Sequence, residues 1–462
     1  MNYSQSKSPF GIILVLALLS GAMALPVQAA DSVAIAGRLK LSGEYGLDRQ
    51  SVEDGPSLSA RLMLDGRQAA WQIHTWVEGG WDGTVDEQQQ DQTTIKRFDK
   101  VYQANTPYLD FKEFYVDQEL TGIDCRIGVQ RFAWGRLDEY PINDLFNPWD
   151  YRQFIVKPME ERKIGVPAVA IGTSRQDWTY QLVWVPWFVP YRLPEPGNRW
   201  SMTPTITAGP DSRAMEVQPR EPDLPTRTVE NSSIGFRIQQ LGEIEWAFNL
   251  FHGFDPRPVF KTTALTVAES RTGLVIDPGY VPSFQRITAV GLDAATVLGS
   301  FSLRTEAAYT INRAFNVRQE FWGYPAVPAL GTTSLNSIVI ESATLDYGIA
   351  ADYQPLEDIL LTIQAQQTLI LDRPDSLFER AIETLLWANL KTDWLNQKIE
   401  TSLNLAYNPE HGANMTKAGI SYVFTDSWKA DINALLLHGP PQSIFGRYAM
   451  NDQIGLEVIY QW

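Results

Sequence analysis

Hydrophobic and polar residues alternate along most of this sequence. In residues 33–47, Leu39 and Leu41 fall on one face of an extended chain, and Arg38 and Lys40 fall on the other. Successive side chains of a strand point to opposite faces, so the pattern predicts a strand with one apolar and one polar side. A strand that faces lipid on one side and water on the other needs this alternation.

The same alternation recurs to the last residue and predicts eighteen strands, an even number like that of single-chain bacterial barrels. Most of them have a length that suits a tilted crossing of a membrane. The predicted strands cover residues 33–47, 57–68, 70–81, 109–120, 122–133, 164–174, 176–188, 230–240, 243–253, 284–298, 300–312, 342–354, 358–371, 383–393, 396–408, 413–425, 427–438 and 450–462.

Tight and longer connections alternate between these strands. Residues 66–69 and 121–122 are among the tight ones, residues 134–163 and 189–229 are among the longer ones, and the short loop at 409–412 is an exception. Short turns at one end and longer loops at the other are typical of an outer-membrane barrel. We therefore predict an all-β fold, a transmembrane antiparallel up-and-down β-barrel of about 18 strands (roughly 16–20), with short periplasmic turns and mostly longer extracellular loops.

Large aromatic residues mark the ends of the predicted strands. A soluble β-sandwich or propeller is the alternative, because its strands alternate too. Trp and Tyr prefer a membrane interface, where one end of the ring system is dry and the other wet, so their positions favour the membrane barrel. The strand-end aromatics are Trp71, Trp81, Trp178, Tyr309, Tyr353, Tyr407, Trp428 and Tyr460.

Residues 1–29 are predicted to be an export signal that is cleaved from the mature chain. Lys7 supplies a positive start, residues 10–25 are apolar, and Val27-Gln28-Ala29 has small residues where cleavage requires them. A retained membrane anchor is the alternative, but the apolar run is short for a spanning helix. Residues 30–462 then form a single transmembrane barrel domain.

The last predicted strand ends on an aromatic residue. Ile454, Leu456 and Val458 share one face with Tyr460 and Trp462. This ending resembles the closing strand of outer-membrane barrels, whose terminal aromatic is read by the barrel-insertion machinery. Tyr460 and Trp462 are therefore the predicted barrel-assembly signal, and the bacterial outer membrane is the predicted location.

Composition argues against several classes of function. The formal net charge of −16 disfavours nucleic-acid binding, because phosphate contacts need clustered Lys and Arg. Cys125 is the only cysteine, and the 4 histidines lack ligand spacing, so no metal and no other cofactor is expected. A barrel enzyme is not favoured either, since the histidines lack an evident nucleophile partner, with no Ser near His252 or His411 in sequence, and G-x-S-x-G is absent.

The polar strand faces are predicted to line a water-filled lumen, as in porins of 16–18 strands. Charges on these faces either select ions or only wet the wall and pair across strands, and the sequence leaves both interpretations open. The candidate lumen-lining residues are Arg38, Lys40, Arg61, Arg126, Arg237, Arg304, Glu306 and Asp346.

Residues 134–163 differ from the other long loops in being rich in aromatic residues, which predicts that they pack against the barrel wall. Asn147-Pro148 is a turn or helix-start signal. The segment either narrows the pore or braces the barrel. The candidate constriction residues are Arg131 and Asp138 together with Arg136, Asp144, Asp150 and Arg152, and we expect the last four to pair with one another.

The stretch GVQRFAWGRLDEYPINDLFNPWD, residues 128–150, resembles a known family. Its spacing G-x-Q-x-x-x-W-G followed by D-x-x-N-P-x-D is similar to that of porin-like outer-membrane β-barrel proteins of proteobacteria known only as a domain of unknown function. The firm resemblance is confined to this stretch, and elsewhere it extends to the barrel pattern and the terminal Trp. The resemblance implies an outer-membrane channel and carries over no ligand.

Residues 189–229 contain eight prolines and are predicted to form an extracellular cap without regular helix or sheet, with disorder as the alternative. The whole pattern predicts a porin-like channel for passive or facilitated diffusion of small solutes. The alternative is a barrel sheath or gated transporter for a specific ligand, hydrophobic ones included, or for a partner protein. Expected partners are outer-membrane lipids, the barrel-insertion machinery and small solutes. A homo-oligomer, the solute and the sign of charge selectivity are left open.

Overall fold

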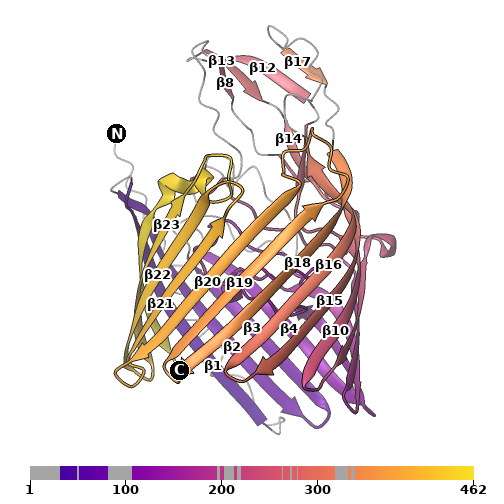
Figure 1. Cartoon of the computed structure of the whole chain (residues 1–462), viewed down its shortest axis with the longest axis vertical. Coiled ribbons are helices and arrows are strands. Elements are labelled where there is room, and N and C mark those ends of the chain that lie inside the picture. Colours follow the sequence, from indigo (N-terminus) through magenta and orange to yellow (C-terminus); the bar gives the residue numbers. More distant parts are fainter. Residues whose placement is uncertain are drawn as a thin grey trace.

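Eighteen antiparallel strands close into one barrel in the computed structural model (Figure 1). Consecutive barrel strands pair with each other, and β1 pairs with β24 to complete the ring. The barrel strands are β1 (Ser32–Gly46), β2 (Ser51–Gln68), β3 (Trp71–Trp81), β4 (Pro107–Leu120), β5 (Ile123–Gln130), β6 (Val166–Arg175), β7 (Trp178–Val185), β9 (Ser233–Gln240), β10 (Ile244–Phe254), β15 (Arg286–Leu298), β16 (Phe301–Asn316), β18 (Val339–Leu356), β19 (Ile359–Ile370), β20 (Ile382–Trp394), β21 (Ile399–Asn408), β22 (Ala413–Thr425), β23 (Trp428–His438) and β24 (Gln453–Gln461).

The structure describes most of the chain, and the predicted signal peptide lies outside the part that it describes. The described residues are 32–48, 51–81, 107–194, 198–201, 213–215, 220–262, 264–270, 273–277, 279–317, 331–334 and 339–462.

The predicted all-β antiparallel barrel is confirmed, strand for strand. Each predicted strand coincides with one strand of the barrel, because one apolar face and tight turns at one end specify both the elements and their pairing. One clear difference concerns β5, which ends at Gln130 before its predicted end at residue 133. The chain turns into the barrel at that point.

The outer face of the barrel carries large apolar side chains around its circumference. Leu41 is 51% exposed, Ile127 57%, Ile349 56% and Leu456 53%. They lie on β1, β5, β18 and β24, and β5 and β18 are several strands away from the β1–β24 seam, so apolar side chains face outward on different sides of the barrel rather than in a single patch. An apolar belt of this kind is the surface that a barrel presents to lipid.

The last residue packs against the first strand. Trp462 N–H donates to the carbonyl of Gly37, and Gly37 N–H donates to the carbonyl of Trp462, both at 3.1 Å. A Cβ on residue 37 would lie 2.0 Å from the Trp462 ring, so only glycine fits beneath the indole. Tyr460 stacks on Trp462 with ring centroids 5.7 Å apart. The C-terminal aromatics are thus part of the closing seam.

A small sheet stands beyond the rim at the long-loop end (Figure 1). Its order is β17-β12-β13-β8, and a separate pair joins β11 to β14. The prediction that residues 189–229 contain no regular sheet is therefore wrong for β8, because residues 211–218 between two prolines are free of proline and can pair. These strands are β8 (Arg213–Met215), β11 (Val259–Thr262), β12 (Ala264–Ser270), β13 (Gly273–Asp277), β14 (Tyr280–Ser283) and β17 (Gly331–Ser334).

Helical structure in the described residues is limited to short turns. None of them is long and apolar enough to cross a membrane. They are α2 (Met159–Arg162), η3 (Val229–Asn231) and η5 (Gly446–Asn451).

Candidate pore constriction

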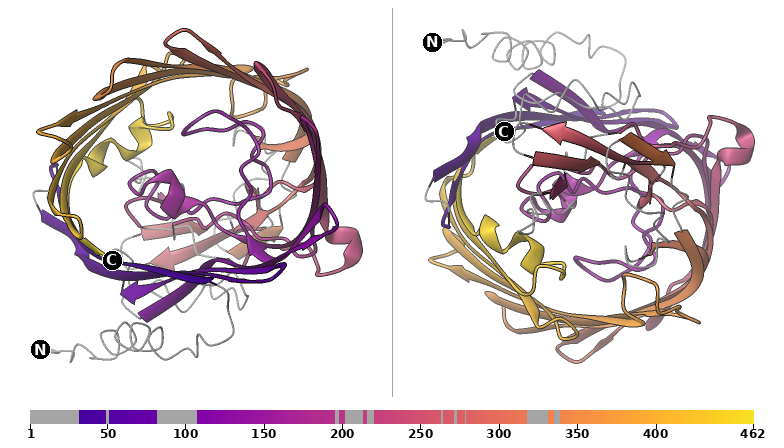
Figure 2. Two further views of the ribbon diagram at one scale, coloured as in Figure 1. Left: turned by 90° about the horizontal axis from the view of Figure 1, so that it is seen from below. Right: turned by 90° about the horizontal axis from the view of Figure 1, so that it is seen from above.

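The connection between β5 and β6, residues 131–165, folds into the barrel (Figure 2), and we call it the inward segment. Asn147 ties its two ends together. The side-chain carbonyl of Asn147 accepts the N–H of Phe132 at 2.6 Å, and its amide donates to the carbonyls of Gln130 and Ile164 at 3.0 and 2.8 Å. No helix begins at Asn147. Its side chain makes these three hydrogen bonds instead, and α2 begins only at Met159.

The first part of the inward segment packs on an apolar strip of the inner wall. Phe146 lies edge-on to Trp134 at a centroid distance of 4.8 Å and to Phe251 of β10 at 5.1 Å. These rings cover small buried residues of β6 such as Ala168 and Ala170. The expectation of a uniformly polar inner face therefore fails on β6, because the inward segment, not water, covers this part of the wall.

Glu306 of β16 anchors the middle of the inward segment. One carboxylate oxygen accepts the backbone N–H groups of Arg136 and Leu137, the latter at 2.5 Å. The other accepts those of Ile142 and Asn143, both at 2.8 Å. Glu306 is 1% exposed, so four neutral donors compensate a carboxylate that is shielded from water. We call this arrangement the Glu306 cradle.

The Glu306 cradle explains why residue 135, in the motif of residues 128–150, is a glycine. Gly135 has φ +106°, a left-handed value that favours glycine. A Cβ at this position would lie 2.7 Å from the Glu306 carboxylate. Any other residue would push the segment off its anchor.

Arg136 joins the inward segment to a buried carboxylate on β15. Its Nε donates to Asp293 at 2.7 Å, and Nη1 donates to Glu245 of β10 at 2.7 Å. Arg237 of β9 donates to the same Asp293 at 2.8 Å. Asp293 is 2% exposed and therefore depends on these two guanidinium groups for compensation.

Arg304 adds a further link on the same side of the barrel. It donates to Asp138 of the inward segment at 2.7 Å and to Asp352 of β18 at 2.8 Å. The backbone N–H of Asp138 donates to Gln364 of β19 at 3.0 Å. Asp138 is thus held from two strands.

Asp144 pairs within the inward segment, with Lys163, which also donates to the carbonyl of Phe132. Burial raises the pKa of Asp144 to about 6, although the charge and hydrogen bond of Lys163 oppose the rise. The nearby carboxylate of Glu306 adds to it. The carboxyl group of Asp144 therefore takes up its proton at a higher pH than an ordinary aspartate does.

The predicted mutual pairing of the four loop charges is only partly right. Asp150 does pair with Arg152, but Arg136 and Asp144 pair elsewhere. Arg192, which follows β7, lies 3.9 Å from Asp150. Burial would raise the pKa of Asp150, but the charges of Arg152 and Arg192 hold it well below the usual range.

α2 brings a second carboxylate anchor to the opposite side of the lumen. Glu161 accepts Lys40 and Arg38 of β1, both at 2.7 Å, and lies 3.7 Å from Arg61 of β2. Lys112 of β4 donates to the main-chain carbonyl of Glu161 at 3.1 Å. Burial would raise the pKa of Glu161, but the charges of Lys40 and Arg38 hold it well below its usual range. We call this group the Glu161 cluster.

The inward segment also contacts the wall formed by β20 to β24. Phe154 packs in a buried cluster with Trp200 and Tyr448, and its centroid lies 4.6 Å from that of Tyr448. Lys417 of β22 donates to the carbonyl of Val156 at 2.6 Å. The segment therefore crosses the lumen from one wall to the other, as the view along the barrel shows (Figure 2).

Of the three remaining candidates, Arg131 begins the inward segment and the other two lie on strands of the wall. Arg131 donates to Glu113 at 3.0 Å and covers the Trp76 ring at 3.9 Å. Arg126 pairs with Asp117 of the neighbouring strand at 2.6 Å. Asp346, near the long-loop end, accepts Arg313, Thr344 and Thr368 at 3.0, 3.0 and 2.6 Å.

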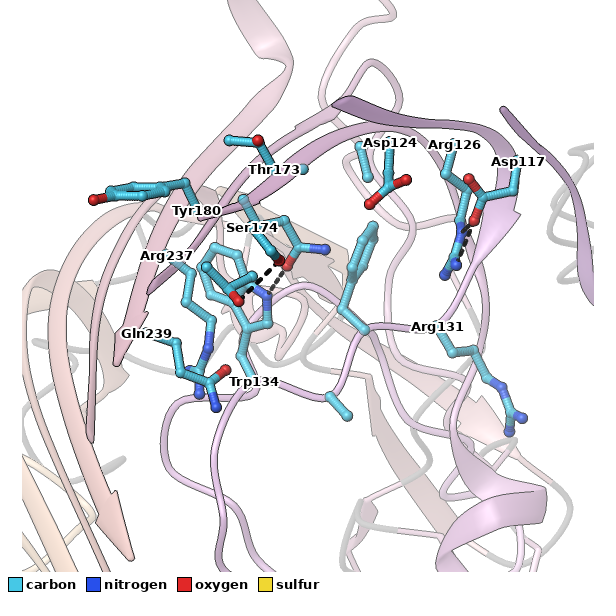
Figure 3. A pocket seen from close by; sticks show the side chains of 16 residues that line it. Asp117, Asp124, Arg126, Arg131, Trp134, Thr173, Ser174, Tyr180, Arg237 and Gln239 are labelled. Carbon is cyan, nitrogen blue, oxygen red and sulfur yellow. Dashed lines mark hydrogen bonds and ion pairs between the residues drawn. The ribbon is translucent and has the colours of Figure 1, made fainter. Parts of the chain in front are cut away.

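A pocket of ≈ 400 Å³ lies between the inward segment and the short turns of β4–β7 and β9 (Figure 3). Arg126, Arg131 and Trp134 line it together with Asp124 and Gln239. The strands supply most of its polar lining, and the inward segment supplies Phe132 and Trp134 together with Arg131. The lumen thus retains open volume on the short-turn side of the segment.

Sequence reasoning missed Asn147 as a tie, Asp293, Lys163 and Glu161. Asp293 sits at an inward position of β15 and could have been found by listing every acidic residue on the polar strand faces. Glu161 and Lys163 lie in an irregular loop, where no periodicity marks an inward side chain. In the described residues, no group of three His, Cys, Asp or Glu side chains is arranged to hold a metal ion.

Residues 57–371 match the model of a family described as "Protein of unknown function (DUF1302)". The chain belongs to this family. The description of the family names no activity. The matched range contains residues 128–150. The predicted membership in a family of unknown function is therefore confirmed. No curated protein matches the sequence significantly.

Several solved structures are similar to this chain at low sequence identity. OccAB1 of Acinetobacter baumannii is 10% identical with a TM-score of 0.48, and 94% of this chain covers 98% of that chain. OccK9 (OpdG) of Pseudomonas aeruginosa is 9% identical with a TM-score of 0.46, covering 93% and 97%. OmpT, an outer membrane protein of Vibrio cholerae, is 7% identical with a TM-score of 0.41, covering 93% and 97%.

Proposed function

We propose that the protein is a porin-like channel of the bacterial outer membrane, through which small solutes diffuse past the inward segment. The observation that carries the proposal is the polar interior. Charged side chains of β1, β2, β15 and β16 point inward and bind one structured segment, while the outer face is apolar. Paired charges inside and apolar side chains outside belong to a barrel with lipid around it and water within it.

A gated transporter for a specific ligand is the second candidate. It is favoured by the contacts of the inward segment with opposite walls, through Glu306 of β16 on one side and Lys40 of β1 on the other. Such a segment either leaves a fixed passage beside it or moves to open one. A sheath around a partner protein has less support, because the inward segment occupies the space that a partner would fill.

We assign no enzymatic reaction to the barrel. In the part of the chain that the structure describes, His74 and His411 pair with carboxylates, and His252 contacts Thr288 and Arg286. A hydrolase of the nucleophilic type would need a base beside a Ser or Cys instead. The proposed partners are lipids at the apolar belt, the insertion machinery at Tyr460 and Trp462, and small solutes in the lumen.

Single-channel recording in a planar bilayer under a salt gradient tests the proposal. A porin-like channel gives discrete, long-lived conductance steps, and the reversal potential reports its ion preference. A gated transporter gives rare or no steps until its ligand is added. A fully inserted barrel that stays silent under every solute tried would contradict the channel proposal.

A further inference from the structure

The cations of the Glu161 cluster belong to the wall, whereas the anion belongs to the inward segment. Arg38 and Lys40 project from β1, and Arg61 projects from β2, so the closed barrel fixes their positions. The side chains of Lys40 and Arg61 are each 8% exposed. Glu161 reaches them from a four-residue helix between irregular stretches. The cations therefore form a prearranged group, and the anion is the removable member.

Glu160 lies 2.8 Å from Arg61, but the other carboxylates near Arg38 and Lys40 are more distant than Glu161. Glu78 lies 4.0 Å from Arg38 and 3.5 Å from Arg61, and Glu457 lies 3.8 Å from Lys40. Among the described residues, Glu161 alone contacts both β1 cations at 2.7 Å. A buried cation without a close anion is costly, so departure of Glu161 would leave a place that favours another anion. Two cationic donors on two oxygens suit a carboxylate group.

We propose that Arg38, Lys40 and Arg61 form a carboxylate-binding subsite of the channel, and that Glu161 of the inward segment holds the place that a small permeating carboxylate takes. This inference rests on the proposed channel function and names its substrate class. A solute carboxylate that enters the subsite displaces Glu161 and frees the α2 turn from the β1–β2 wall. The chain thus selects small organic acids in spite of its negative net charge.

Glu161 belongs to the same chain as the cations that it binds, so its competition with a dissolved carboxylate can be estimated. A group held on a short linker has an effective concentration on the order of mM or above, so free acetate competes with Glu161 only at comparable concentrations. Glu161→Gln keeps the shape of the side chain but removes its charge. Acetate should then bind about tenfold more tightly than in the wild-type protein, because its site is no longer occupied.

Glu160→Gln is the matched control. It removes the same charge one residue away, from a side chain that is 61% exposed and pairs with Arg61 at 2.8 Å. Glu161 stays paired with Arg38 and Lys40 in this variant, so the place between the two β1 cations remains occupied. Reversal potentials in a chloride gradient and inhibition of the chloride current by acetate are measured for the wild type and both variants. Glu161→Gln should shift the reversal potential strongly toward anions and show saturable inhibition at the lower acetate concentration. Glu160→Gln should resemble the wild type in acetate inhibition.

Equal shifts in the two variants would overturn the proposal, since net charge alone would then explain them. Binding of ¹³C-labelled acetate to the folded variants in detergent micelles, followed by NMR, needs no open pore. If no variant conducts but Glu161→Gln still binds acetate more tightly than Glu160→Gln, the channel proposal fails and the subsite stands. If the channels conduct and acetate binds all three proteins equally, the subsite fails and the channel stands.

A second variant covers the case in which Glu161→Gln does not fold. Lys40→Met removes one wall cation and leaves Glu161 in place. In the wild type, acetate at high concentration should increase current fluctuations more than chloride at the same ionic strength, and Lys40→Met should reduce that difference. Identical fluctuations in acetate and chloride in the wild type would contradict the proposed displacement.

Discussion

Two carboxylates hold the inward segment, and they do so in opposite ways. Glu306 belongs to the wall and binds four backbone N–H groups of the segment. Glu161 belongs to the segment and binds side-chain cations of the wall. The first contact uses neutral donors at fixed positions in the backbone, and the second uses charges on flexible side chains.

The difference predicts how each anchor responds to its surroundings. Four convergent backbone donors fit one carboxylate in one geometry. That carboxylate is attached to a strand of the wall, so a dissolved anion does not displace it. Side-chain cations accept any carboxylate, and dissolved salt weakens their attraction when they are partly exposed, as Arg38 is. We therefore expect Glu306 to set the position of the constriction and Glu161 to set its mobility.

The largest effect is expected from Glu306→Ala. Four backbone donors lose their acceptor in this variant. Each donor that stays buried without a new partner costs about 1–3 kcal/mol, and a donor that bonds to water instead costs less. The variant should therefore lose about 3–5 kcal/mol of unfolding free energy. Urea unfolding in detergent micelles, followed by tryptophan fluorescence, measures the change. Glu306→Gln retains one carbonyl oxygen and should lose roughly half as much. Glu400→Ala, at an exposed pair with Lys429, serves as the control.

The second effect concerns salt. Raising KCl from about 0.1 M to about 1 M shortens the screening length from about 10 Å to about 3 Å, so the partly exposed Arg38 contact of the Glu161 cluster weakens, while the buried Lys40 contact and the Glu306 cradle change little. Current fluctuations of the wild type should rise modestly with salt. In Glu161→Gln they should be high at both concentrations. A wild type whose fluctuations ignore salt would show that the cluster does not limit the mobility of the segment.

A third, smaller effect is expected from pH. The pKa of Asp144 is raised by burial to about 6, so the folded protein takes up a proton before the unfolded chain does as the pH falls. Its contribution is present in full below the unfolded pKa near 4 and is lost as the pH rises through about 6. From pH 7.5 to pH 5 the free energy of unfolding should rise by about 1 kcal/mol.

Comparison with Asp144→Asn isolates this contribution, because all other groups titrate in both proteins. Unfolding midpoints of the two proteins, measured at the same two pH values, should diverge. Parallel changes would mean that Asp144 titrates at its ordinary value and that Lys163 compensates its burial.

The smallest effect is expected from Arg131→Lys. The guanidinium groups of Arg131 and Arg61 lie 3.9 and 4.2 Å from the centroid of the Trp76 ring. Lysine keeps the charge near Glu113 but loses the planar contact with the indole, which should cost about 0.5–1 kcal/mol. Unfolding midpoints check this value, and conductance should change little. A large change in conductance would instead make Arg131 part of the narrowest passage.

The barrel was predictable because its information is local and repeated. Alternation in residues such as 33–47 and tight turns such as Thr121–Gly122 specify strand, face and partner one hairpin at a time. The C-terminal strand was equally clear, since Trp462 ends an alternating run. The inward segment could be recognised as unusual from its aromatic residues and from its motif.

The contacts of the inward segment were not predictable in the same way. Arg136 meets Asp293, which lies far along the chain, and Asp138 meets Gln364 on β19. Such pairs depend on where an irregular backbone crosses the lumen, and no period in the sequence records that path. The small sheet containing β8 was missed for a related reason, because short strands without alternation resemble loop.

The measurement that tests the account most directly is the conductance of a barrel without its constriction. Residues 136–162 are replaced by a short Gly-Ser linker, and single-channel steps are compared with those of the wild type in the same salt. The account predicts stable steps in the wild type and steps larger by roughly threefold or more in the variant, because the segment fills much of the lumen. Equal steps in the two proteins would contradict the claim that the inward segment narrows the pore.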